Sequence, residues 1–133
     1  MKLPAVLFLA LPMTSLAGEF TLQTNDYLYV VEQSESEARS IGSIVVRVYE
    51  YEGDASSRTF FVAGGVFSRD GSIVDVTLYD VTLDGVDELV VVTESVGTGG
   101  YKHFMAISRD AETLELLEVR SPDDPKVTID EVF

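Results

Sequence analysis

The stretch SVGTGGYKHF, residues 95–104, contains the residues whose types and spacing come closest to those of a functional site. Three glycines occupy four positions around one threonine, and a tyrosine, a lysine and the only histidine of the chain follow at once. Glycine-rich loops bind phosphate where their backbone amides open a helix. The P-loop spacing G-x-x-x-x-G-K-[ST] is missing here, and strand-like segments flank the loop on both sides. Phosphate and dinucleotide binding are therefore excluded, and no cofactor is expected.

A loop that presents side chains to a partner is a second interpretation. A phenol that follows glycines has little to pack against locally, and tyrosine is a favoured interface anchor because it offers large area at low entropic cost. An ordinary glycine-rich hairpin connection is the alternative. If the loop binds a partner, its candidate residues are Gly97, Thr98, Gly99, Gly100, Tyr101 and Lys102.

An acidic turn, DVTLDGVDE at residues 80–88, resembles part of a calcium-binding loop. Candidate oxygen ligands at alternating positions are Asp80, Thr82, Asp84 and Glu88. The twelfth position counted from Asp80 is Val91, where such a loop needs a bidentate glutamate. We therefore favour an acidic turn without metal, and a calcium-dependent adhesion or surface-binding β module remains an alternative function.

The sequence lacks the residue patterns of common catalytic sites. The chain has no cysteine, its single histidine cannot form a zinc site alone, and no G-x-S-x-G elbow is present. We expect a binding protein and not an enzyme; a small secreted hydrolase is the rival, and it lacks an evident nucleophile and base.

The first 17 residues predict a secretory signal peptide. Lys2 precedes an apolar run that ends in the small-x-small sequence SLA, and the run is too short to span a bilayer. Residues 18–133 then form one domain, which we expect in the periplasm or secreted. No cysteine is available for a lipid anchor or a disulfide.

The charge balance limits the partners. The formal net charge of −14 becomes −15 if residues 1–17 are removed, because Lys2 is the only charged residue among them. An acidic chain is unsuited to nucleic acid and, after signal cleavage, to anionic membranes, whereas a basic protein partner would be attracted.

The remaining segments predict an all-β domain, an antiparallel meander that forms a sandwich or barrel. A short helix or polar loop is expected at 32–40, and an edge strand could follow the prolines after Ser121. In residues 72–81 the alternation places Val74, Val76 and Leu78 on the core face. The expected strands lie in 20–32 (two strands), 43–52, 58–68, 72–81, 88–95, 102–110 and 113–121.

Residues 69–107 resemble the periplasmic inhibitors of invertebrate-type (i-type) lysozyme. In that family an acidic turn leads into an apolar strand and then a loop of pattern Ser-Gly-Ser-Tyr, and the segment 38–50 is similar to the family's first long strand. The resemblance implies an all-β lysozyme inhibitor, without calcium in its acidic turn, that inserts a loop into the enzyme's active-site cleft; it also implies a homodimer. The loop corresponds to Thr98, Gly99, Gly100 and Tyr101, with Gly100 in place of the second serine.

Overall fold

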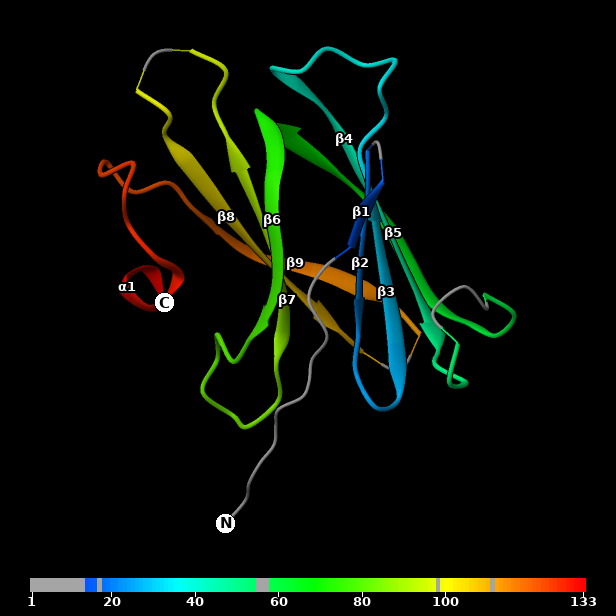
Figure 1. Ribbon diagram of the computed structural model, residues 1–133. Helices are drawn as coiled ribbons and strands as arrows, with labels where there is room; N and C mark the ends of the chain where they lie inside the picture. The colour runs from blue at the N-terminus through cyan, green and yellow to red at the C-terminus, as the bar shows by residue number, and fades with distance from the viewer. Residues whose placement is uncertain (1–13, 17, 55–57, 98, 111) are drawn as a thin grey trace.

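The computed structural model describes residues 14–16, 18–54, 58–97, 99–110 and 112–133, and it contains two antiparallel sheets (Figure 1). The first sheet has the strand order β1-β2-β3-β4-β5 and the second the order β6-β7-β8-β9. The expected all-β meander is confirmed as an open sandwich. Its strands are β1 (Thr14–Leu16), β2 (Glu19–Gln23), β3 (Tyr27–Glu32), β4 (Ile41–Glu50), β5 (Phe61–Asp70), β6 (Ser72–Tyr79), β7 (Glu88–Glu94), β8 (Lys102–Arg109) and β9 (Leu114–Arg120).

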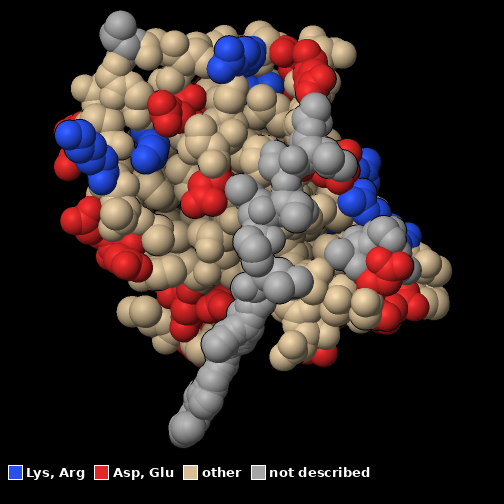
Figure 2. Space-filling view, viewed as in Figure 1, with Lys and Arg blue, Asp and Glu red and all other residues tan. Residues whose placement is uncertain are grey.

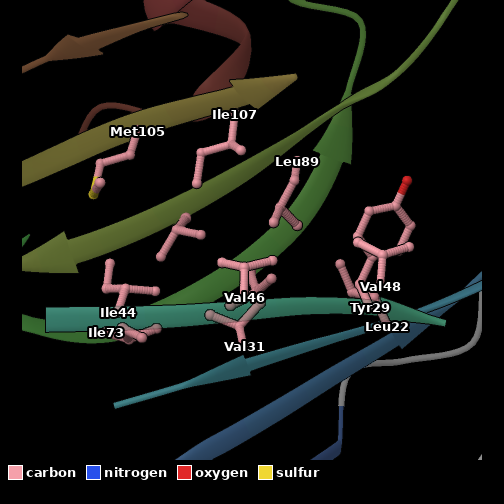
Figure 3. Packing of buried hydrophobic residues seen from close by; sticks show 12 residues of the cluster. Leu22, Tyr29, Val31, Ile44, Val46, Val48, Ile73, Leu89, Met105 and Ile107 are labelled. Carbon is pink, nitrogen blue, oxygen red and sulfur yellow. The ribbon is translucent and has the colours of Figure 1, made fainter. Parts of the chain in front are cut away.

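The main core lies between the two sheets and is built from β-branched and aliphatic side chains. Val31, Ile44 and Val46 from the first sheet meet Ile107 from the second (Figure 3). Val91 of the second sheet belongs to the same cluster, and all five are fully buried or nearly so. Such side chains suit a pleated, buried surface, and their removal from water is the main stabilising term of a chain without disulfides.

The strand β7 is the buried central strand that its continuous apolar run predicts. Its inner face contacts the main core, and a second cluster covers its outer face. That cluster includes Phe133 and Ile129, which come from the C-terminal segment and the short helix α1 (Ile129–Val132). The prediction of an edge strand in this tail is wrong: a capping box from Thr128 and Glu131 starts a helical turn, which lies against the second sheet.

The alternation in β6 is broken by a bulge. The pairing with β7 shifts between Ile73 and Asp75. Ile73 therefore lies in the core, and Val74 is 44% exposed. The prediction that Val74 faces the core is wrong, because an extra residue in one strand reverses the side-chain direction beyond it.

The polar segment 33–40 is a loop and not a helix, and the buried Arg69 holds it in place. The Arg69 guanidinium donates to the carbonyls of Ala38 (3.0 Å), Arg39 (3.0 Å) and Gly71 (2.6 Å). Every bond of this kind satisfies a backbone acceptor with a charged donor. One side chain thus joins the β3–β4 loop to the turn between β5 and β6.

Residues 14–16 form β1, which pairs with β2 at the edge of the first sheet. A mature chain that begins at Gly18 would lack β1, and β2 would then be the edge strand. The signal peptide remains a prediction, because residues 1–13 and 17 lie outside the described part of the chain. Within the described residues, no helix has the length and apolar character to cross a bilayer.

Charged side chains are distributed unevenly over the visible face of the molecule. Figure 2 shows acidic groups gathered at the lower end, over the turn between β6 and β7, and both signs of charge at the upper end. The glycine-rich loop lies at the upper end, together with the 33–40 loop (Figure 1).

Candidate functional site

The glycine-rich loop joins two central strands of the second sheet. The strands β7 and β8 pair from Leu89–Ile107 up to Glu94–Lys102, and the Ser95 amide then donates to the Tyr101 carbonyl at 2.8 Å. This bond closes the loop at its base. The loop is therefore a short projection on a rigid ladder, which is how binding loops are commonly presented.

Two of the glycines are required by the backbone and by their neighbours. Gly99 has φ 103° and Gly100 has φ 59°, both in the left-handed region that disfavours side chains. A Cβ on Gly99 would stand 2.6 Å from Cε2 of Tyr101, so the tyrosine ring lies directly against this glycine. Tyr101 is 46% exposed. The loop thus supports an aromatic ring on a glycine and leaves Tyr101 partly exposed to a partner.

The other candidates occupy different places. Gly97 has open space around it, and Thr98 lies outside the described residues. Lys102 is not part of the turn: it is the first residue of β8, is half-buried and pairs in register with Glu94. The structure therefore brings together Gly99, Gly100 and Tyr101, with Lys102 at the base of the loop.

A histidine contact that the sequence does not reveal supports the same base. His103 Nε2 lies 3.2 Å from the Ser95 hydroxyl, and its Nδ1 lies 2.7 Å from the Ser121 hydroxyl. The imidazole thereby connects the first residue of the loop to the segment that follows β9. Ser95 and His103 are separated by eight residues, and only the strand register shows that they meet across the hairpin.

The start of the loop also contacts the turn between β5 and β6. A Cβ on Gly71 would stand 2.2 Å from the Glu94 carbonyl oxygen and 2.9 Å from the Ser95 amide nitrogen. The Gly71 amide donates to the Ser40 carbonyl at 2.8 Å, and the Ser72 hydroxyl donates to the Arg39 carbonyl. The glycine-rich loop and the 33–40 loop thus both contact the turn between β5 and β6.

The acidic turn is organised by its own backbone. The Asp80 carboxylate accepts the amides of Asp84 (3.1 Å) and Gly85 (2.8 Å), and the Glu88 carboxylate accepts the Val81 amide (2.8 Å). The Val86 amide lowers the pKa of Asp84, whereas burial, followed by the charge of Asp80, raises the pKa of Asp87. Backbone amides thus stabilise the ionised form of Asp84, whereas the ionised form of Asp87 is disfavoured.

The same acids satisfy part of a metal geometry. Oxygens of Asp80, Asp84 and Glu88 all lie within 4.8 Å of one another. However, Val91, at the twelfth position, is fully buried in β7 and cannot supply a ligand. The bonds to backbone amides account for the turn, and a calcium site here stays a hypothesis to be tested.

Comparisons with known proteins agree on one family. The sequence model for the periplasmic lysozyme inhibitor of I-type lysozyme (PliI) matches residues 19–128. A search of curated protein sequences gave no match. Among solved structures, the chain is similar to PliI from Aeromonas hydrophila, with a TM-score of 0.67 and 27% identity over 93% of this chain and 96% of the other.

A second structure is that of Aeromonas hydrophila PliI in complex with Meretrix lusoria lysozyme. It matches with a TM-score of 0.67 and 30% identity, and covers 79% of this chain and 85% of the inhibitor. These matches confirm the resemblance drawn from the acidic turn and the glycine-rich loop. The chain belongs to the family of periplasmic inhibitors of i-type lysozyme, and it is a lysozyme inhibitor and not an enzyme.

Proposed function

We propose that the chain inhibits an i-type lysozyme by inserting the loop Gly97–Tyr101 into the enzyme's active-site cleft. The observation that carries this proposal is the exposed Tyr101 ring on a loop closed by the bond between the Ser95 amide and the Tyr101 carbonyl. A loop whose base is closed before binding has less conformational entropy to lose on binding. The closed base therefore favours the entry of the projection into a cleft.

The roles of the residues follow from their chemistry. The narrow glycine backbone allows close approach to the walls of the cleft, and its amides can donate to the lysozyme's acidic groups. The Tyr101 ring fills a site that would otherwise receive a sugar, and the Thr98 hydroxyl adds a donor. The lysozyme acids are then covered by protein and cannot reach the cell-wall polymer.

The charge of the chain favours the encounter. A lysozyme that acts on an anionic polymer benefits from a basic surface, and the inhibitor carries a formal charge of −14. Opposite charges accelerate association and make it sensitive to salt. The periplasmic location of the family places the inhibitor between the incoming enzyme and the wall that it degrades.

The experiment is a lytic assay with Meretrix lusoria lysozyme and the purified chain that begins at Gly18. We expect Tyr101→Ala to weaken inhibition at least tenfold, as for a central aromatic anchor of about 2 kcal/mol, and Thr98→Ala to weaken it less. Phe60→Ala is the matched control, because Phe60 is also about half exposed, at 52%, and precedes β5 at the opposite end of the molecule. Equal inhibition by the wild type, Tyr101→Ala and Thr98→Ala would contradict the insertion of this loop.

The homodimer implied by the family resemblance is a separate proposal. Light scattering of the same preparation over a range of concentrations measures its mass directly. A mass of one chain throughout would contradict the dimer and leave the role of the loop untouched.

A further inference from the structure

A groove of about 450 Å³ opens on the outer face of β6, β7 and β8, beside the C-terminal segment. Figure 1 shows that segment and α1 on the side of the second sheet that is turned away from the first. The strand register places Asp75, Val92 and Phe104 in one row across the three strands. Glu94 and Lys102 form the pair at the last step of the β7–β8 ladder, directly below the glycine-rich loop. The groove is therefore continuous with the base of the loop.

The groove combines an apolar floor with charged side chains. Val92 and Phe104 are buried and form an apolar floor, whereas Val74 is 44% exposed at the rim. Two carboxylates, on Asp75 and Glu94, line the groove together with one ammonium group, on Lys102. The groove thus offers apolar contact along its length and a net negative charge.

The bulge in β6 creates this surface. A regular strand would direct Val74 into the core, as the alternation of the sequence predicts, but the shifted pairing leaves both Val74 and Asp75 exposed at the groove. Bulges commonly redirect side chains next to functional sites. An exposed valine is better accommodated against a partner than in water, and the exposed carboxylate beside it can bind a cationic group of that partner.

We propose that this groove receives a lysine or arginine side chain from the rim of the lysozyme cleft when the loop is inserted. Such side chains lay their alkyl stems along apolar surface and keep the charged group at a polar end. The floor of Val92 and Phe104 accommodates the stem, and Asp75 and Glu94 accept the charged group. The inference rests on the proposed insertion of the loop, because the loop brings the rim of the lysozyme over the groove.

The test measures the affinity of the chain for Meretrix lusoria lysozyme by calorimetry at two salt concentrations. We expect Val74→Arg, which fills the groove and repels a cation, to weaken binding about tenfold, and Asp75→Asn to weaken it several-fold with a smaller salt dependence. Asp75→Glu keeps the carboxylate and should retain most of the affinity. The controls are Val66→Arg on the outer face of β5 and Asp26→Asn in the β2–β3 turn, which make the same changes at exposed positions outside the groove.

The outcomes separate this inference from the proposed function. Binding of Val74→Arg and Asp75→Asn within twofold of the wild type, together with weak binding of Tyr101→Ala, would overturn the groove contact and retain the loop. Weak binding of the groove variants together with unchanged binding of Tyr101→Ala would contradict the insertion of the loop and, with it, the proposed contact between the groove and the rim of the cleft. If Val74→Arg does not fold, the pair Asp75→Asn and Asp75→Glu decides, because both changes are made at an exposed side chain.

Discussion

The Glu94 carboxylate lies in tight contact with the position that a Cβ on Gly100 would take. A Cβ on Gly100 would stand 3.1 Å from Oε2 of Glu94, and the backbone of Gly100 has a positive φ of 59°. Both facts favour glycine here, where the family resemblance points to serine. Where the family's loop has its second serine, this chain thus has a glycine next to the Glu94 carboxylate.

Substitutions at Gly100 should separate backbone strain from the contact with Glu94. We expect Gly100→Ala to lower the free energy of unfolding by about 1 kcal/mol, because a left-handed backbone is unfavourable for any residue with a Cβ. Gly100→Ser carries the same strain, but its hydroxyl can donate to the Glu94 carboxylate, so its loss should be smaller. Urea denaturation of both variants measures the difference. If alanine and serine cost the same, the Glu94 carboxylate does not accept this bond.

The Glu37 carboxylate should make the free energy of unfolding decrease as the pH becomes acidic. It accepts bonds from the Ser43 amide (2.8 Å) and hydroxyl (2.9 Å) and lies near Arg69, and these contacts, the amide first, lower its pKa. A lowered pKa in the folded state means that the stabilisation is present above the pKa of the unfolded chain and is lost as the pH falls through the folded value. We therefore expect wild type to lose more stability than Glu37→Gln between about pH 5 and pH 3.

Thermal melts at several pH values test this expectation, with Glu35→Gln as the control for removing one acid from the same loop. Parallel pH profiles for wild type and Glu37→Gln would show that the Ser43 contacts do not stabilise the folded state.

The strands could be predicted from the sequence because their apolar residues are β-branched and alternate, and because the turns carry Gly and Asp. The break in β6 could not: nothing in the letters of residues 72–79 distinguishes a bulge from a regular strand, since the extra residue is defined only against its partner β7. Likewise, the apolar Ile129 and Phe133 of the tail read as an edge strand, although they cover the outer face of the second sheet through a helical turn.

The loop at residues 97–101 was evident from its glycines, but its supports were not. His103 reaches Ser95 and Ser121 from a strand, and Gly71 contacts the backbone of Glu94 from another turn. These contacts join segments distant in sequence, and their residue types are common in loops. Arg69, which is buried and donates to four backbone carbonyls, looks like an ordinary surface arginine until the fold is known.

Thr93 is an unfavourable residue in the core. Its side chain is fully buried in β7, and among the described residues its hydroxyl has no hydrogen-bond partner. A buried hydroxyl without a partner costs about 1 kcal/mol or more, and valine has nearly the same shape. We expect Thr93→Val to raise the free energy of unfolding by about that amount, whereas Thr93→Ser, which keeps the hydroxyl and loses a methyl group, should lower it. Urea denaturation distinguishes the two, and a destabilised Thr93→Val would indicate that the hydroxyl has a partner, such as a bound water.

Calcium should leave the stability of the chain unchanged. The Asp80 carboxylate already accepts the amides of Asp84 and Gly85, so a cation would compete with donors that are built into the turn. We expect the melting temperature to be the same in EDTA and in millimolar calcium, and Asp80→Asn to lose about 1 kcal/mol in both, because a neutral amide accepts these bonds less well. A rise of several degrees with calcium that disappears in Asp80→Asn would identify the turn as a cation site and contradict this prediction. Magnesium at the same concentration controls for the effect of ionic strength on a chain with a formal charge of −14.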